Sequence, residues 1–289
     1  MPLADSKILY YHLNNRRAGT GDLSQTMERA RESNAVFVDA WDALNSGSAG
    51  FESCRGGLVE VSWGGVPVVF FNLAVTARTP SSAGEFEVAA LDTSAWTAAR
   101  TLPWLFAVCH ETMGELMPEA GRTLERLGLA PMMALTGMAA EEVSPPHREP
   151  PAGRCRTESD AQAPDLMLRL NEAAYQMPLG ESGSLAMERP GWWAPPRRMA
   201  TVLEAEGRPA GCAAVVDVGG LRYVALVATH PGLRRRGYAD AAMRDVLARS
   251  LAAGLGPRTY LHATEAGRPV YERMGYTATA EYTVYGKHE

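Results

Sequence analysis

The sequence predicts a mixed α/β protein with two similar lobes, each built on a mixed β-sheet with helices on its faces. Residues 58–75 and 200–218 each contain two apolar runs around a Gly-x-Pro turn, which is typical of a β-hairpin. The segment LERLGL (124–129) is similar to YERMGY (271–276), and the two pairs of matches keep the same order and similar offsets. This repetition indicates internal duplication of one α/β unit, with chance similarity of short motifs as the alternative.

A stretch rich in proline and charge separates the two lobes. Residues 144–164, SPPHREPPAGRCRTESDAQAP, contain few large apolar side chains, so they bury too little surface to order themselves strongly. We therefore predict a first lobe over residues 1–143, a linker over 144–163 and a second lobe over 164–289.

The second lobe has the clearer pattern of elements. Its periodicity predicts a helix at 164–177, followed by a loop that contains Trp192 and Trp193. The expected strands lie near 201–206, 211–217, 222–228, 258–263 and 276–286. Another helix begins around Arg236 or Gly237, and a short one ends at Gly275. The apolar stripe expected on the first of these two helices consists of Ala239, Met243, Val246, Leu247 and Leu251.

The composition argues against several classes of protein. The chain has 289 residues, of which 46% are hydrophobic and 21% charged, and its net charge of −5 is unlike that of a protein that coats nucleic acid. No apolar run approaches the ~20 residues that span a membrane, and the first residues lack a signal-peptide pattern. The four cysteines are far apart, which argues against a zinc site and suits reduced thiols in the cytoplasm. They are Cys54, Cys109, Cys155 and Cys212.

The segment VATHPGLRRRGYA (227–239) carries the strongest chemical signal. A strand ends near Thr229, Pro231 and Gly232 turn the chain, and a helix then begins. The first N–H groups of a helix lack internal partners and carry partial positive charge, so they suit phosphate oxygens. Gly237 and Ala239 let a bulky anion approach the backbone closely. The pattern therefore predicts a phosphate site, with an ordinary solvated turn as the alternative.

The spacing Arg234-x-x-Gly237-x-Ala239 resembles the signature of the GNAT superfamily of acyl-CoA-dependent N-acyltransferases. The segment GRPVYERMGY (267–276) is similar to a second motif of that superfamily, and the resemblance covers about residues 164–286. It implies two GNAT-like lobes, of which the first resembles the non-catalytic lobe of tandem members. Between Leu73 and Leu124 the first lobe has no such loop, and Leu124 stands where the second has Tyr271. We therefore expect only the second lobe to bind CoA.

The resemblance also implies roles for particular residues. It assigns the pantetheine arm to the strand backbone at Val227, Ala228 and Thr229. It assigns the pyrophosphate to the loop that Arg234 begins, at the amides of Arg235, Arg236, Gly237, Tyr238 and Ala239. Tyr271 matches the tyrosine that protonates the departing thiolate. The chain departs from the family where Thr264 replaces a frequent Asn and Gly267 a frequent Ala, although the Thr264 hydroxyl is still polar.

Direct acyl transfer needs a donor for the oxyanion and a proton for the thiolate. We expect the donor to be a strand N–H near Ala228 and the acid to be Tyr271. The sequence does not identify the general base: His262 and Glu265 are close to the site in sequence, but the alternation of side chains along a strand can turn either of them away. Trp192 and Trp193 either shape the acceptor pocket, which we expect between the lobes, or cover a core edge.

These observations favour an acetyl-CoA-dependent N-acetyltransferase that acts on a primary amine in a ternary complex, without a metal. A second hypothesis is a module that binds acyl-CoA as a sensor or scaffold without turnover. A third, a nucleic-acid binder that uses the three arginines, ranks last because the chain is acidic. We expect a small-molecule or peptide amine as the acceptor and no nucleic-acid or membrane partner. The sequence leaves open the acceptor's identity, the acyl-chain length and the oligomeric state.

Overall fold

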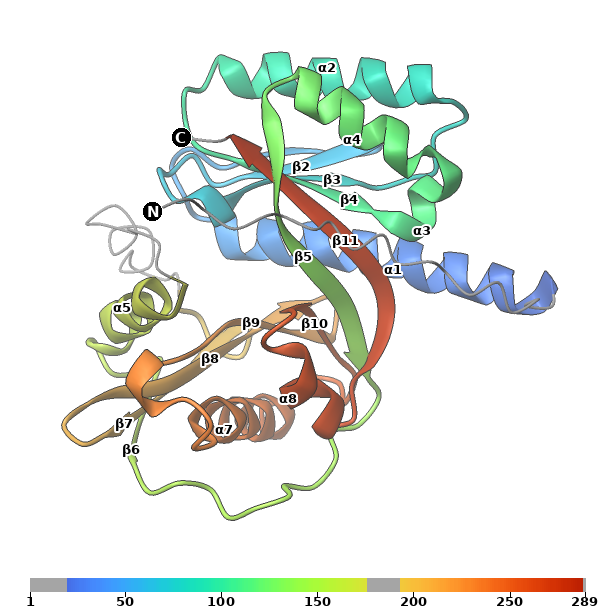
Figure 1. Ribbon diagram of the computed structural model, residues 1–289. Helices are drawn as coiled ribbons and strands as arrows, with labels where there is room; N and C mark the ends of the chain where they lie inside the picture. The colour runs from blue at the N-terminus through green and yellow to red at the C-terminus, as the bar shows by residue number, and fades with distance from the viewer. Residues whose placement is uncertain (1–19, 176–192, 288–289) are drawn as a thin grey trace, which may run out of the picture.

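The structure is a computed structural model that describes residues 20–175 and 193–287 (Figure 1). Its centre is an eleven-stranded sheet in the order β1-β2-β3-β4-β11-β5-β10-β9-β8-β7-β6. Helix α1 spans Thr20–Asn45. The first half continues with β1 (Glu52–Cys54), β2 (Val59–Trp63), β3 (Asn72–Thr76), α2 (Ala83–Ala98), β4 (Leu105–Cys109), α3 (His110–Met113), α4 (Met117–Arg126) and β5 (Leu129–Ala140). The second half contains β6 (Arg154–Thr157), α5 (Ala163–Tyr175), β7 (Arg198–Ala205), β8 (Arg208–Val218), β9 (Leu221–Thr229), α7 (Tyr238–Ala252), β10 (Thr259–Thr264), α8 (Arg268–Arg273) and β11 (Thr277–Lys287).

The two halves repeat one order of elements. Three antiparallel strands lead to a helix, a strand parallel to the third, a helical segment and a long last strand. In this order β3-α2-β4 corresponds to β9-α7-β10, so the hairpin β2-β3 corresponds to β8-β9. The sequence comparison paired residues 58–75 with 200–218, which form β7-β8, and the structure shifts this correspondence by one strand. The mixed α/β fold with two similar parts is confirmed.

The last strand of each half pairs with the other half. Strand β11 lies between β4 and β5, and β5 in turn pairs with β10 (Figure 1). The Tyr282 hydroxyl on β11 hydrogen-bonds to Ser33 and to Asn34 of α1, both at 2.8 Å. The segment 276–286 is therefore a strand as predicted, but it completes the sheet of the first half.

Helices cover both faces of the sheet. On one face α1 crosses both halves and α5 lies beside it, and their apolar side chains pack on β3, β4, β11 and β7–β10. On the other face α2 and α4 cover the first half, while α7 and α8 cover the second (Figure 1). On α7 the buried side chains include Ala242, Met243, Val246 and Leu247, whereas Leu251, expected in the buried stripe, is 50% exposed.

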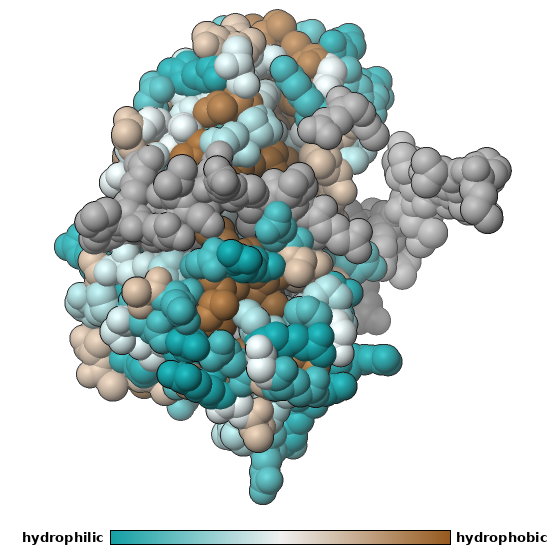
Figure 2. All heavy atoms as spheres, turned by 90° about the vertical axis from the view of Figure 1, so that its left-hand side faces the viewer, coloured by the Kyte–Doolittle hydropathy of each residue, from teal (hydrophilic) through white to brown (hydrophobic). Residues whose placement is uncertain are grey.

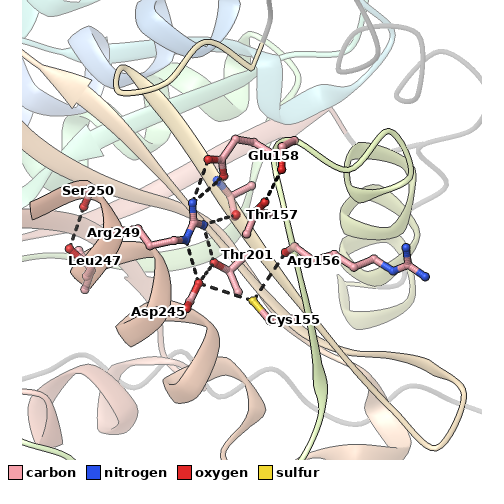
Figure 3. A network of polar contacts seen from close by, with 11 residues as sticks. Cys155, Arg156, Thr157, Glu158, Thr201, Asp245, Leu247, Arg249 and Ser250 are labelled. Carbon is pink, nitrogen blue, oxygen red and sulfur yellow. Dashed lines mark hydrogen bonds and ion pairs between the residues drawn. The ribbon is translucent and has the colours of Figure 1, made fainter. Parts of the chain in front are cut away.

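Part of the expected linker is ordered. Residues 154–157 form β6, an edge strand that pairs with β7. Next to it the Glu158 carboxylate accepts hydrogen bonds from Arg249 at 2.9 Å, and Arg249 also contacts Asp245 and Thr201 (Figure 3). The segment contains few large apolar side chains, as the sequence indicated, but a network of charge-assisted hydrogen bonds holds it on the second half.

Candidate active site

The strands β9 and β10 separate in the middle of the sheet. They pair in parallel only at Arg222 with Thr259 and at Tyr223 with Tyr260. Further along β9, Leu226 has a φ of +54°, and the register with β8 shifts between Cys212 and Ala214. Such a bulge bends its strand and frees backbone groups from the ladder. The result is an opening between two adjacent parallel strands.

One edge of β9 faces this opening. The backbone of Ala228 hydrogen-bonds to the Cys212 thiol on β8, and the His230 N–H donates to the Ala210 carbonyl at 3.0 Å. Because successive residues of a strand point their N–H groups to opposite edges, the N–H groups of Val227 and Thr229 point away from β8. Near Ala228, where we expect the oxyanion donor, the N–H groups that face the opening are therefore those of Val227 and Thr229.

The arginine loop connects β9 to α7 as the sequence predicts. Residues Pro231–Leu233 form a 3-10 turn, Arg235 has a φ of +64°, and Gly237 has a φ of +91° and precedes the first residue of α7. At Gly211 on β8, a Cβ would lie 2.6 Å from the Tyr238 backbone, so this glycine lets the start of α7 approach the sheet. The N–H groups of the first turn of α7 thus lie beside the end of β9.

The three arginines have different surroundings. Arg234 donates to the Ala174 carbonyl at the end of α5 at 3.0 Å, and Arg236 forms an ion pair with Glu206 at 2.8 Å. Arg235 is exposed, and its carbonyl accepts a 3.3 Å hydrogen bond from the Arg148 guanidinium. Arg148 was not predicted as a site residue because it lies in the expected linker, and nothing in its neighbourhood in the sequence indicates this contact.

Tyr271 lies at the opening, on α8. It is buried, it lines the cavity described below, and burial raises the pKa of its phenol well above its ordinary value. Thr264 accepts a 3.3 Å hydrogen bond from the Gly267 N–H, so its hydroxyl helps to start α8. A Cβ on Gly267 would lie 3.0 Å from the ring of Tyr271. These two departures from the family pattern therefore shape the turn that positions Tyr271.

A cavity of about 150 Å³ extends from the opening toward the first half. Its wall includes Val227 and Tyr271 at the opening, Phe37 and Trp41 on α1, and residues of β3, β4, β5 and β11. On the side of the molecule where α5 lies, hydrophobic residues reach the surface near the middle of the molecule (Figure 2). The expected site between the two halves thus corresponds to an apolar cavity.

His262 lies in the cavity wall and is held on three sides. Its Nδ1 is 2.9 Å from the Tyr223 hydroxyl, its Nε2 is 3.3 Å from Ser33 Oγ, and its ring stacks on Phe37 at 3.7 Å. Burial lowers the pKa of His262 to about 3. Glu265, the other candidate base, is exposed on the turn before α8. The geometry therefore brings His262, and not Glu265, into the cavity wall.

Tyr175 and Tyr223 contact residues of this region although the sequence did not predict them as site residues. Trp192 and Trp193 were predicted there. The Tyr175 hydroxyl donates to the Val227 carbonyl at 2.9 Å, and Tyr223 contacts His262. Both belong to ordinary amphipathic patterns, so the sequence gives no sign of their position. Trp193 packs against the core under α5, while Trp192 lies outside the described residues.

The first half has the same topology without the same opening. Strand β4 pairs in parallel with β3 from Leu73 to Val75. At the ends of these strands, the Cys109 N–H donates to the Thr76 hydroxyl at 2.9 Å. At the start of α2, Ser82 accepts from the Glu85 N–H. The Glu85 carboxylate accepts from Ser81 in turn, so this helix start is capped by its own residues. The two halves therefore differ in how the two parallel strands pair and in how the helix between these strands begins.

Comparisons with known proteins agree with this geometry. Residues 166–276 match the family model described as the acetyltransferase (GNAT) family. No curated protein sequence matches the chain. A GCN5-related N-acetyltransferase from Kribbella flavida is 20% identical with a TM-score of 0.65, over 90% of this chain and 96% of that one. A conserved protein of unknown function from Staphylococcus epidermidis ATCC 12228 is 11% identical with a TM-score of 0.59, over 82% and 94% of the two chains.

A third solved structure, a GCN5-related N-acetyltransferase from Sphaerobacter thermophilus, is 16% identical with a TM-score of 0.52, over 80% of this chain and 76% of that one. These structures share the fold of this chain. The match to the acetyltransferase (GNAT) family model lies within the second half of the chain. Within the described ranges, every helix is too short or too polar to cross a membrane. The same residues contain no group of three His, Cys, Asp or Glu placed to hold a metal.

Proposed function

We propose that this protein is an acetyl-CoA-dependent N-acetyltransferase with one active site, in its second half. The observation that carries the proposal is the separation of β9 from β10 directly before the glycine-ended loop and the start of α7. A thioester arm fits the opening between strands, and a pyrophosphate fits the helix start beside it. The matching region of the first half lacks both features, so we propose that it does not bind CoA.

The residues around the opening suit the parts of acetyl-CoA. The amides of Arg235, Arg236, Gly237, Tyr238 and Ala239 would hold the pyrophosphate, with Arg148 adding charge at the rim. Thr229 would pair with the pantetheine arm through its outward N–H group, and Val227 would lie where the arm meets the thioester. Ala228 would support this edge from within the sheet, and Arg234 would fix the end of α5 beside it. Thr264 and Gly267 would act through the position of α8.

The proposed chemistry uses two groups of this chain. The Val227 N–H would stabilise the oxyanion, and the Tyr271 phenol would protonate the departing thiolate. Its raised pKa keeps the phenol protonated at neutral and mildly alkaline pH, as a general acid requires. His262 is neutral in the same range and orients Tyr223 through its Nδ1. The amine then has to arrive uncharged, because no carboxylate belongs to the described part of the cavity wall.

We propose three functional segments in the chain. Residues 1–143 form a part that does not bind CoA, residues 144–163 connect the two parts, and residues 164–289 form the acetyltransferase part. The first part supplies α1 and strands to the cavity wall, so we propose that it helps to hold the acceptor. Cys54, Cys109, Cys155 and Cys212 are all free thiols, which supports a cytoplasmic location.

Calorimetry with acetyl-CoA, followed by an assay for free thiol with a set of primary amines, tests this function. We expect binding at micromolar concentrations and thiol release that depends on both substrates. No binding at hundreds of micromolar would overturn the proposal. Binding without thiol release for any amine would instead favour a sensor of acyl-CoA.

A further inference from the structure

The cavity joins the opening to the first half of the molecule. Its wall runs from Val227 and Tyr271 at the near end to Leu105 on β4 and Val284 on β11 at the far end, which are the strands of the wall farther from β9 in the sheet order. The far-end residues Leu105 and Val284 pack with α1, on the sheet face opposite to α7 and α8. The two reactants would therefore reach the opening from opposite faces, with acetyl-CoA on the α7 side and the acceptor on the α1 side.

The cavity wall carries no formal charge among the described residues that line it. Its members there are apolar apart from seven with a polar group. These seven are Trp41, Asn171, Tyr175, Tyr223, His262, Thr264 and Tyr271. A carboxylate, phosphate or ammonium group placed in such a cavity would lose its hydration without gaining a partner of opposite charge.

Most of these polar groups already hydrogen-bond within the protein. Asn171 donates to the Met167 and Leu226 carbonyls, at 2.9 and 3.3 Å. Tyr175 donates to Val227, and Thr264 accepts from Gly267. The Tyr223 hydroxyl and the His262 ring form a hydrogen bond with each other. A polar acceptor would have to break these bonds to form its own, whereas an apolar one leaves them intact.

The volume limits the size of the acceptor. A dry cavity of ~150 Å³ lined by aliphatic and aromatic side chains holds a molecule the size of benzene. The cavity here has about the same volume and a wall of the same kind. It therefore fits one ring-sized apolar group, with the reacting nitrogen at the end where Val227 and Tyr271 lie.

We infer that the acceptor is an uncharged primary amine on an apolar group about the size of one ring, as in an arylamine. This substrate class rests on the proposed function, because the near end of the cavity is the proposed reaction centre. Amino acids, polyamines and lysine side chains do not fit this cavity. Each of them either brings a charge close to the reacting amine or leaves the apolar end of the cavity unfilled.

The experiment compares an apolar arylamine with amines that carry a charged group. With acetyl-CoA as donor, thiol release is measured with 4-methylaniline and with 4-aminobenzoate, which has a carboxylate in place of the methyl group, and with spermidine and free lysine. We expect kcat/KM for 4-methylaniline to exceed each of the other three by about tenfold or more. Equal or greater rates with spermidine, lysine or 4-aminobenzoate would overturn the substrate class and leave the transferase activity intact.

Variants at Leu135 test whether the cavity is the binding site. Leu135 is half-buried in the wall, so Leu135→Phe should fill part of the cavity and raise KM for 4-methylaniline about tenfold, with KM for acetyl-CoA unchanged. Leu251→Phe is the matched control, because Leu251 is 50% exposed on α7. If Leu135→Phe does not fold, Leu135→Ala serves instead and should lower KM for the longer 4-butylaniline. Unchanged KM values in the folded Leu135 variants would overturn the inference.

A further arm identifies the cavity's occupant. If octanoyl-CoA with spermidine reacts more than about tenfold faster than acetyl-CoA with 4-methylaniline, the cavity holds the acyl chain, and the inference is wrong. Calorimetry of 4-methylaniline without acetyl-CoA separates this inference from the proposed function. Binding of the amine that Leu135→Phe abolishes, without any acetyl-CoA binding, would support the cavity's ligand class and overturn the transferase function.

Discussion

The Arg148 guanidinium lies against the backbone of Gly237, at the start of α7. A Cβ added to Gly237 would be only 2.7 Å from the guanidinium carbon, and Arg148 Nη1 donates to the neighbouring Arg235 carbonyl. Arg148 belongs to the segment between the two halves, more than eighty residues before the loop in sequence. The connecting segment therefore adds a cation to the place where we propose that the pyrophosphate binds.

Arg148→Ala should weaken acetyl-CoA binding without affecting the fold. Arg148 is exposed, so we expect the Kd to rise only about two- to fivefold, and the difference to shrink as salt screens the charge. Calorimetry at low and high ionic strength measures both effects. Arg154→Ala, an exposed arginine in the same segment, is the control and should leave the Kd unchanged. A Kd for Arg148→Ala equal to that of the control would remove Arg148 from the site.

Gly237→Val should weaken acetyl-CoA binding more than Arg235→Ala. Gly237 has a φ of +91°, which is strained for a β-branched residue, and its added atoms would displace Arg148 and cover the amides at the start of α7. Arg235 is exposed and only lends charge. Gly219→Val is the control, because Gly219 has a φ of +61° with open space around it.

The control variant Gly219→Val should lose about 1–3 kcal/mol of stability, as Gly237→Val does, but it should keep its affinity for acetyl-CoA. Thermal unfolding and calorimetry on the same samples separate the two effects. If Arg235→Ala weakens binding more than Gly237→Val, the backbone amides are not the main contact of the pyrophosphate.

How much the sequence predicts depends on the range of the contacts involved. The loop before α7 was predictable because turn residues, a glycine with positive φ and the strand before it are all local signals. The position of β11 was not, because any strand of this composition can pair in either half. Contacts such as Tyr282 with Ser33 decide that choice, and they join residues that are far apart in the chain.

The same reasoning applies to the site. Tyr271 could be predicted from a local motif, and it lines the cavity. Arg148, Tyr175 and the apolar residues of the first half could not, since each reaches the site through the tertiary fold. The linker predicted over residues 144–163 contains β6, which the sequence analysis did not foresee, because the ion pair between Glu158 and Arg249 beside this strand is a contribution that apolar content does not measure.

Tyr271→Phe should lower kcat by ~10²- to 10⁴-fold and leave the Kd for acetyl-CoA unchanged, because the phenol is the proposed donor to the thiolate. Tyr276→Phe is the matched control. Tyr276 is also buried with a raised pKa, and it packs against Tyr271 with ring centroids 6.1 Å apart, but it faces the core under α7. Steady-state kinetics with the best acceptor measure both variants. If Tyr271→Phe turns over like the control, another group is the acid.

His262 should make the stability of the protein depend on pH in the acidic range. Burial lowers its pKa from 6.5 to about 3, so between these values the unfolded chain holds a proton on the ring that the folded chain does not. The free energy of unfolding should therefore fall as the pH drops below about 6.5, by at most ~1.4 kcal/mol per pH unit from this one group. His262→Asn should make that fall less steep, while His147→Asn, at an exposed position, should not. Urea unfolding at several pH values from 7 to 4 measures the slopes, and equal slopes for all three proteins would mean that His262 titrates alike in the folded and unfolded chains.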